Sequence, residues 1–428
     1  MNFKRSCGVI SMANERNVPE LRFEGFNGEW DKKFLGDLLE IWSATRVHKD
    51  EWKTEGVPFF RSSDVVSAFM GKDNIKAYIS HELYHSLSAI SGKVIKDDVL
   101  VTGGGSIAIP YFVKNDDPLY FKDGDLLLLR DVSKSKVNGQ FLFYFFASPR
   151  FRKYVTSITH IGTISHYTIE QAKTTPVILP KIKEQNTIGN FFRNLDDTIA
   201  FKKQQYEQTV NIKKAMLEKM FPRKGADVPE IRFEGFTGTW GSAIFGAKCD
   251  IVRGGSPRPI DSYITTAVNG INWIKIGDVD KGTKYIKRTN EKIKPEGLAM
   301  SRLVKRGDFI LSNSMSFGRP YIMQIEGCIH DGWLAIQNYS SSFNTEFLYY
   351  LLASERVLNQ YMERAAGSTV KNLNKDLVAS IEVIFPQIDE QIVIAKYFSS
   401  LDTLIESQQE ELEKFQNVKK ACLSKMFV

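Results

Sequence analysis

The sequence predicts a mixed α/β fold. Two homologous α/β globular domains are separated by two long helices, which form an antiparallel coiled coil and give the chain pseudo-two-fold symmetry. Three features support this prediction: the chain repeats itself once, each copy opens with short β-rich runs, and each copy closes with a long proline-free stretch of helical periodicity. The offset of about 208 residues between the copies exceeds the period of solenoid repeats, so it indicates a duplicated domain with its connector.

The duplication is clearest in two pairs of motifs. VPELRFEGFNGEW at 18–30 returns as VPEIRFEGFTGTW at 228–240, with 10 of 13 positions identical. LPKIKEQ at 179–185 returns as FPQIDEQ at 385–391. The first motif opens each copy and the second marks the end of its globular part, so both copies are divided in the same way.

The globular part of each copy is typical of an α/β domain. Runs such as INWIKIGDV and PVILP alternate with short helical stretches such as FLFYFFASPRFRKYV. The residues before Val18 lie outside the repeat, with Met12 as an alternative start, and we expect a disordered tail there. The predicted divisions are the tail at 1–17, globular domains at 18–180 and 225–386, a central helix at 181–224 and a C-terminal helix at 387–428.

The closing stretches predict two long helices. No proline interrupts them, and 185–221 aligns without gaps to 391–427 with 15 of 37 identities. Apolar residues recur at spacings of three and four, or their multiples, at Ile188, Phe192, Leu195, Ile199, Tyr206, Val210, Leu217 and Met220, and at Ile394, Phe398, Leu401, Ile405, Leu412, Phe415, Leu423 and Met426. An isolated helix cannot bury such a stripe, so we expect the two helices to pair as an antiparallel spacer about 55 Å long.

Polar residues of these helices carry two further expectations. The apolar seam turns polar at the equivalent positions Lys202 and Gln408, which either fix the helix register or are solvated where the helices separate. The lysine pairs at 213–214 and 419–420 predict a solvated, dipole-compensating face near each helix C-terminus.

The composition narrows the class of protein. Lys and Arg total 57 against 50 Asp and Glu, a net charge of +7, and 1–180 and 225–386 each carry only +2. This mild excess permits a polyanionic partner but requires focused contact patches. The four cysteines are far apart and no apolar run is long enough to cross a membrane, so we expect a cytoplasmic protein without a disulfide framework or a metal site.

Sequence motifs of catalysis are missing. The chain has no phosphate-binding loop, dinucleotide-binding turn, adenine-methylation motif or nuclease carboxylate cluster, so we expect a non-catalytic protein. His81 and His85, within HELYH, match the spacing of zinc proteases, but no third ligand is signalled. A metal-dependent hydrolase or nuclease that uses HELYH remains one alternative, and a coiled-coil scaffold that does not bind DNA remains another.

The combined motifs resemble the specificity subunits of type I restriction–modification systems. The resemblance rests on the twin VPE[LI]RFEGF openings, the twin P-x-I-x-E-Q helix starts and the twin [IV]KKA-x-L-x-KMF helix ends. GGSP at 254–257, GINWIKIGDV, KRGDFILS and AAGSTV add to it in the second copy, and the resemblance covers residues 18–428. The first copy lacks the GGSP pattern and has IWSATRVHKDEW at 41–52 instead.

The resemblance implies a division of labour. Each globular domain would be a target recognition domain for one half of a bipartite, asymmetric site in double-stranded DNA, and the helices would fix the distance between the half-sites. Two copies of a methyltransferase (modification) subunit and the motor–nuclease restriction subunits would be the protein partners. S-adenosylmethionine, ATP and Mg would be bound by those subunits, with no cofactor in this chain.

Polar and basic residues in Gly- and Ser-rich loops are the candidates for DNA contact, because base recognition needs donors and acceptors that a rigid scaffold presents. In the first domain they are Arg46, His48, Arg61, Ser63, Ser106, His160, Thr163, Ser165 and His166. In the second they are Arg253, Ser256, Arg258, Lys275, Asn313, Ser314, Ser316, Arg319, Ser368, Thr369, Lys371 and Asn372.

Overall fold

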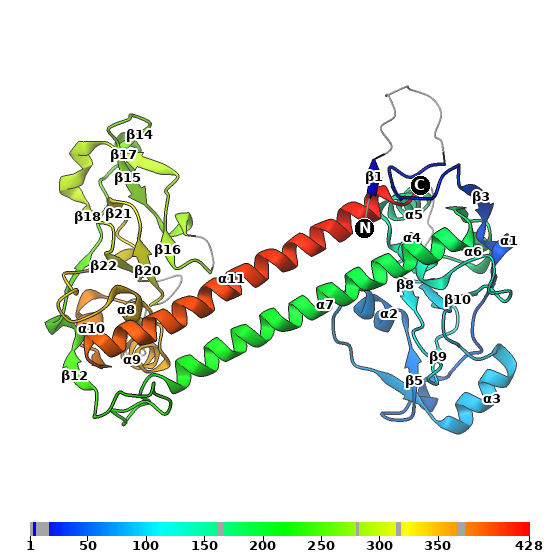
Figure 1. Cartoon of the computed structure of the whole chain (residues 1–428), viewed down its shortest axis with the longest axis horizontal. Coiled ribbons are helices and arrows are strands. Elements are labelled where there is room, and N and C mark those ends of the chain that lie inside the picture. Colours follow the sequence, from blue (N-terminus) through cyan, green and yellow to red (C-terminus); the bar gives the residue numbers. More distant parts are fainter. Residues whose placement is uncertain (1–2, 6–16, 161–165, 280–281, 314–317, 366–372) are drawn as a thin grey trace. The chain divides into compact units, whose positions relative to one another are not determined.

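The computed structural model divides the chain into two compact units, and it describes residues 3–5, 17–160, 166–279, 282–313, 318–365 and 373–428. Unit 1 comprises Met1–Lys203 and Glu410–Val428, and unit 2 comprises Gln204–Gln409. Each unit therefore combines one globular domain with parts of both long helices (Figure 1). None of the described helices is both long and apolar enough to span a membrane.

Unit 1 is built from small sheets covered by short helices. One sheet has the order β4-β10-β7-β8 and is antiparallel throughout, and a second has the order β6-β5-β9 with a parallel β5–β9 pair. β3 and β11 form a separate antiparallel pair. The strands are β2 (Leu21–Phe23), β3 (Asp31–Phe34), β4 (Glu40–Trp42), β5 (Val57–Phe60), β6 (Ala77–Ile79), β7 (Val99–Thr102), β8 (Pro110–Phe112), β9 (Tyr120–Phe121), β10 (Leu126–Arg130) and β11 (Pro176–Leu179). The helices are α1 (Leu35–Leu38), η1 (Lys49–Glu51), α2 (Ser62–Phe69), α3 (His81–Ser91), α4 (Gly139–Ala147), α5 (Pro149–His160) and α6 (Ile169–Lys173).

Unit 2 repeats this plan with larger sheets. Its sheets have the orders β13-β22-β19-β20-β16 and β14-β17-β15-β21-β18, and β12 pairs with β23 as β3 pairs with β11. The strands are β12 (Gly241–Ile244), β13 (Asp250–Arg253), β14 (Ile264–Thr265), β15 (Ile271–Ile274), β16 (Tyr285–Ile286), β17 (Glu291–Ile293), β18 (Arg302–Val304), β19 (Phe309–Ser312), β20 (Pro320–Met323), β21 (Gly327–Ile329), β22 (Trp333–Gln337) and β23 (Glu382–Phe385). The helices are η2 (Phe245–Ala247), η3 (Ile260–Ser262), η4 (Ile276–Asp278), η5 (Pro295–Met300), α8 (Thr345–Leu352), α9 (Glu355–Ala365) and α10 (Lys375–Ala379).

Two helices of 38 residues each, α7 (Ile182–Lys219) and α11 (Ile388–Lys425), supply both units. In unit 1 the start of α7 pairs with the end of α11, because Asp196 contacts Lys419 at 2.5 Å while Lys202, further along α7, contacts Glu411 at 2.9 Å, further back along α11. Increasing residue numbers in α7 thus meet decreasing numbers in α11. The helices run antiparallel in this unit, as the sequence pattern predicts.

A Tyr–Asp–Lys triad anchors the helices to the domain in each unit. In unit 1 the Tyr144 hydroxyl of α4 donates to Asp196 at 2.8 Å, and Lys419 contacts the same carboxylate. Burial and the nearby carboxylate raise the pKa of Tyr144 far above its usual value, so its hydroxyl stays protonated and donates. The duplication-related residues of unit 2 are Tyr350, Asp402 and Lys213, which make the same contacts. Lys213 and Lys419 therefore bridge two helices, and the expectation of a merely solvated face was wrong for them.

The predicted apolar stripe is buried at the helix ends and less so in the middle. Ile188 and Phe192 of α7, and Ile394 and Phe398 of α11, are all at most 2% exposed. Val210 departs from the prediction, because it is 36% exposed while its neighbour Thr209 is buried. Thr209 avoids an unpaired hydroxyl by donating to the Gln205 carbonyl at 3.0 Å within the helix.

The polar seam positions differ between the units. In unit 1 Lys202 is satisfied by its ion pair with Glu411. In unit 2 the side-chain oxygen of Gln408 is buried and has no hydrogen-bond partner among the described atoms. Lys202 is thus a paired residue that can favour one register, which is the first of the two expectations for it.

The ends of the two helices complete the domain cores. Phe427, just after α11, is 4% exposed and lies 5.4 Å from the Phe141 ring and 5.9 Å from the Phe192 ring. Its duplicate Phe221, just after α7, lies 5.6 Å from Phe347 in the core of unit 2. Each core therefore depends on the end of the helix that begins in the other unit.

The twin sequence motifs meet as twin ion pairs. Arg22, from the first RFEGF motif, contacts Glu184 at 2.7 and 2.8 Å, and Arg232 contacts Glu390 at 2.7 Å with both carboxylate oxygens. Both glutamates come from the E-Q of the helix-start motifs and are at most 4% exposed. The two motifs are repeated together because one supplies the cation and the other the anion of a buried pair.

The segment expected to be a disordered tail contains one strand. β1 (Phe3–Arg5) pairs antiparallel with β2, with Lys4 opposite Arg22. Residues 1–2 and 6–16 lie outside the described part of the chain.

The helix-end anchors predict a selective loss of stability. Phe427→Ala should destabilise unit 1 by about 3–5 kcal/mol, because truncating a buried Phe removes apolar burial and leaves a cavity. Amide hydrogen exchange, followed by mass spectrometry, should speed up in α4 and stay unchanged in α8. Phe201→Ala is the matched control, since Phe201 is 56% exposed. Equal acceleration in α4 and α8 would contradict the assignment of Phe427 to one core.

Candidate nucleic-acid interface

The GGSP loop of unit 2 borders an open hollow of about 1120 Å³. Its apolar lining comes from the loop and from β14 and β15, with Pro257, Ile264 and the buried Trp273. Its charged lining consists of Arg258, Asp261, Lys275, Glu291 and Asp331, with His330 beside them. The hollow thus combines flat apolar surface with side chains of both charges.

Asp331, in the turn between β21 and β22, brings the predicted contact residues of this domain together. Ser256 Oγ donates to Asp331 Oδ1 at 3.0 Å, and Arg258 Nη2 lies 3.4 Å from Oδ2. Arg253 Nε and Asn313 Nδ2 both donate to the Asp331 carbonyl, at 3.3 and 3.2 Å. Three predicted residues around the GGSP loop and one from the SNSMSFGR segment therefore converge on one aspartate.

The electrostatics of this turn favour an ionised Asp331. Partial burial alone would raise the pKa of Asp331, but the hydrogen bond from Ser256, the adjacent His330 and the positive charge of Arg258 outweigh it and lower the pKa. His330 Nε2 lies 2.9 Å from Asp331 Oδ1, and its Nδ1 accepts from the Gly332 amide at 2.9 Å. The carboxylate is thus held by the turn itself while Arg258 stays 80% exposed.

Two other predicted residues of this domain are held by contacts of their own. Lys275 Nζ is paired with Glu291 Oε1 at 2.6 Å on the wall of the same hollow. Arg319 does not line the hollow, and its guanidinium lies over the Tyr321 ring at 5.5 Å. Lys275 therefore belongs with the group around Asp331, and Arg319 does not.

In unit 1 the structure separates the predicted residues. Arg61 pairs with Asp64 through two hydrogen bonds and lies over the Trp52 ring at 5.7 Å, and the bond to Asp64 raises the pKa of Arg61. It therefore holds the start of α2. Arg46 and His48 are exposed in the loop before η1, and Ser63 is exposed on α2.

The TGGGS loop of unit 1 lies beside His166. Gly104 pairs with His166 in an isolated β-bridge, and Ser106 is exposed at the tip of the loop. Arg152 of α5 supports this loop by donating to the Ile107 carbonyl at 3.1 Å and to the Ala108 carbonyl. Burial lowers the pKa of Arg152 to about 10.

Several predicted residues cannot be placed. Thr163, Ser165, Ser314, Ser316, Ser368, Thr369, Lys371 and Asn372 lie outside the described residues, as does the side chain of His160. Asp331 itself was missed, although the turn HDGW between two apolar runs was a visible signal.

The HELYH motif forms the start of α3. Ser80 caps this helix by accepting from the Leu83 amide at 3.1 Å, and both His81 and His85 are exposed. Among the described residues, no group of three or more His, Cys, Asp or Glu could hold a metal ion. The described structure therefore offers no support for the hydrolase alternative.

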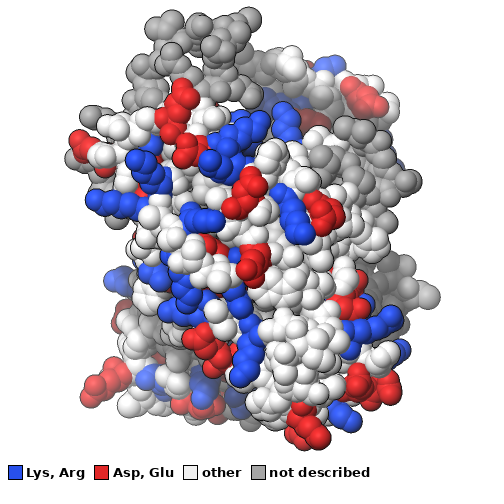
Figure 2. All heavy atoms as spheres, turned by 90° about the vertical axis from the view of Figure 1, so that its right-hand side faces the viewer, with Lys and Arg blue, Asp and Glu red and all other residues white. Residues whose placement is uncertain are grey.

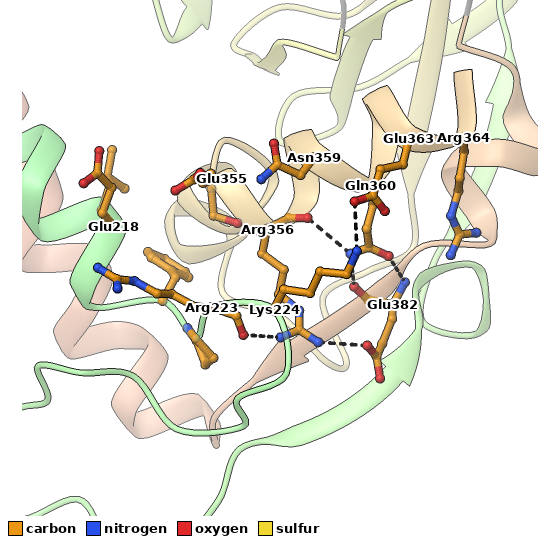
Figure 3. Close-up of a pocket in the computed structure, with 14 residues that line it drawn as sticks. Glu218, Arg223, Lys224, Glu355, Arg356, Asn359, Gln360, Glu363, Arg364 and Glu382 are labelled. Atoms are coloured by element: carbon orange, nitrogen blue, oxygen red, sulfur yellow. Dashed lines mark hydrogen bonds and ion pairs between the residues drawn. The ribbon is translucent and has the colours of Figure 1, made fainter. Parts of the chain in front are cut away.

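A second hollow of unit 2, of about 600 Å³, lies where α7 ends (Figure 3). Arg356 of α9 donates to the carbonyls of Arg223 and Ala226, at 2.7 and 3.0 Å, and contacts Glu382 of β23 at 2.8 Å. These contacts tie the connector after α7 to α9 and β23. We assign this hollow a structural role, because Arg356 pairs with Glu382 and Lys224 with Glu363 across its lining.

One face of the molecule carries mixed charge. Figure 2 shows Lys and Arg side chains interspersed with Asp and Glu on the face turned to the viewer. This agrees with the near-neutral globular domains of the sequence. Contact with a polyanion would therefore depend on local groups such as those around Asp331.

Comparison with known proteins gives consistent results. The model of the type I restriction modification DNA specificity domain matches twice, over residues 27–211 and 249–415. Two similar proteins come from Methanocaldococcus jannaschii: the type I restriction enzyme MjaVIII specificity subunit, 22% identical over 97% of this chain and 96% of its own length, and the sequence named for the MjaX specificity subunit, 24% identical over 97% of both.

Solved structures show the same fold. The S subunit of the type I restriction–modification system from M. genitalium matches with a TM-score of 0.58 and 15% identity, covering 96% of this chain and 99% of that one. A chain from a study of complex assembly and conformational transition of the type I system matches with a TM-score of 0.54 and 18% identity, covering 92% and 96%. The predicted α/β fold with long helices is confirmed.

The family match also settles the resemblance drawn from the motifs. Members of this family are specificity subunits, which are non-catalytic, so the expectation of a chain without enzymatic activity is confirmed. Because the two matched segments cover most of the sequence, the protein belongs to the family of type I restriction–modification DNA specificity subunits.

Proposed function

We propose that this specificity subunit recognises a bipartite, asymmetric site in double-stranded DNA, with one half-site for each globular domain. The observation that carries the proposal is the convergence of Arg253, Ser256, Arg258 and Asn313 on Asp331 beside an open hollow. Unit 1 has the same framework but a different loop set, with the TGGGS loop against His166. Two unlike recognition surfaces on one framework suit two unlike half-sites.

The helices would act as the spacer between the half-sites. The ion pairs between α7 and α11 in each unit, and the burial of both helix ends in domain cores, support a stiff connection. Major grooves on one face of DNA recur about every 34 Å, which is compatible with helices of this length.

The helices would also bind the protein partners, which we propose to be two copies of a methyltransferase subunit, together with restriction subunits. Duplicated helical surfaces provide two similar docking sites. Large apolar side chains left exposed on α7 and α11 support this role: Phe201, Val210, Ile212, Leu404 and Val418. S-adenosylmethionine, ATP and Mg would be bound by these partners, and we propose that the complex acts in the cytoplasm.

Loss of the exposed arginines beside Asp331 should weaken DNA binding. Arg253→Ala combined with Arg258→Ala, in the full chain assembled with its methyltransferase subunits, should lower affinity for the cognate duplex roughly tenfold or more and reduce its salt dependence. Fluorescence anisotropy over a series of salt concentrations measures both.

The charge-matched control is Lys305→Ala with Arg306→Ala, which removes two exposed cations from the turn between β18 and β19 of the same unit. It should bind the cognate duplex nearly as the unmodified chain does. An equal loss from both double variants would show that net charge, and not the group at Asp331, governs binding.

The length of the helices should set the spacer. Deleting residues 203–209 from α7 and 405–411 from α11 shortens both by one heptad, about 10 Å, while keeping the Asp196–Lys419 and Asp402–Lys213 pairs. The preferred spacer should shorten by about three base pairs at ~3.4 Å each. Selection from a duplex library with randomised spacer length measures this, and a change in half-site sequence instead would contradict the spacer role.

A further inference from the structure

The hollow beside the GGSP loop is lined by carboxylates as well as cations. A surface that bound only phosphates would carry cations without carboxylates. Asp331 and Glu291 line it together with Arg258 and Lys275, so each wall offers one cation and one anion. A carboxylate repels the DNA backbone, but it accepts a hydrogen bond from the amino group of a base. The presence of acceptors at this surface therefore favours contact with base edges.

The two oxygens of Asp331 are not equivalent. Oδ1 accepts from Ser256 at 3.0 Å and lies 2.9 Å from His330 Nε2, which fixes the carboxylate in place. Oδ2 has Arg258 at 3.4 Å, a distance at the long limit of a hydrogen bond. Oδ2 therefore keeps capacity to accept another donor.

Arg258 also keeps unused hydrogen-bonding capacity. Its side chain is 80% exposed, and its long contact to Asp331 engages one of the five N–H donors of a guanidinium. A guanidinium with free donors can contact O6 and N7 of guanine together, which is the commonest specific contact to a base. The neighbouring carboxylate can accept from N4 of the paired cytosine.

We propose that this hollow of unit 2 recognises a G·C base pair, with Arg258 donating to guanine and Asp331 Oδ2 accepting from cytosine. The proposal rests on the proposed DNA-recognition function and adds the base pair and the two residues that select it. Pro257 and Ile264 supply the apolar surface beside the base pair, with the buried Trp273 behind them. Ser256 and His330 act as positioning residues that hold the carboxylate.

The test uses the full chain assembled with its methyltransferase subunits and a duplex library in which both half-sites are randomised. The bound fraction is sequenced to obtain the preference at every position. For the unmodified chain, one position of the half-site assigned to unit 2 should require G·C by roughly ten- to a hundredfold over other base pairs.

Two variants probe the two residues separately. Asp331→Asn removes the charge but keeps the shape and an acceptor for Ser256, and an amide suits adenine better than cytosine, so the preference at that position should shift towards A·T. Arg258→Lys keeps the charge but loses the forked donor, so discrimination for G·C should fall by about tenfold or more with little loss of overall binding. The other half-site should stay unchanged in both.

Glu296→Gln, at an exposed carboxylate of η5, is the control and should leave every position unchanged. Binding with the original preference in both Asp331→Asn and Arg258→Lys would overturn this proposal while leaving the DNA-recognition function in place. Binding of the unmodified complex without preference at any position would overturn both. The Arg258→Lys variant keeps the test decisive if Asp331→Asn perturbs the turn.

Discussion

The structure depends on one constraint: the apolar stripes of α7 and α11 must be buried. The end of each helix is buried in the core of a globular domain. Phe427 packs against Phe141 and Phe192 in unit 1, and Phe221 packs against Phe347 in unit 2. A domain of this kind lacks part of its core until the helix from the other unit arrives. Duplication of a domain with its helix satisfies this requirement within a single chain, because each helix closes the core that the other leaves open.

The polar contacts add specificity to this apolar pairing. The Tyr–Asp–Lys triads hold α4 and α8 against both helices, and the ion pairs between α7 and α11 favour one register. Unit 2 has an additional cation in this place. Lys284 is 9% exposed, is paired with Glu346 and lies 4.4 Å from the centre of the Tyr350 ring. The residue of unit 1 that corresponds to Glu346 is the neutral Gln140. The contacts that attach each domain to its helices are therefore similar in the two units but differ in charge.

The sequence predicted the features that rest on periodicity and repetition. The two long helices and the α/β character follow from patterns of 3.6 and 2 residues, and the motif pairs marked residues that form buried ion pairs, Arg22 with Glu184 and Arg232 with Glu390. The sequence could not predict contacts between residues that are far apart along the chain. In the sequence Asp331 is an ordinary turn residue, yet it accepts hydrogen bonds from residues up to 78 positions away. Val210 was predicted as buried because heptad spacing assumes uniform pairing, which the exposed middle of the helices does not show.

The candidate site was predictable only in part, because loop composition is a local signal and contacts between distant residues are not. Loop composition identified Arg253, Ser256, Arg258, Lys275 and Asn313, because Gly, Ser and Asn are frequent in turns that present polar side chains. It also selected Arg61, whose guanidinium is used to hold α2, since sequence alone does not show that Asp64 and Trp52 lie beside it. Whether a basic residue is free or engaged depends on neighbours that folding supplies.

The most direct measurement is the exchange of one domain. Replacing residues 229–386 with the equivalent segment of a relative that has a different target, and then mapping methylated adenines across the genome of cells that carry the complete system, tests whether recognition is divided between the units. The account predicts that one half-site changes to that of the donor, while the other half-site and the spacer stay as they were. A change in both half-sites, or retention of the original site, would contradict it.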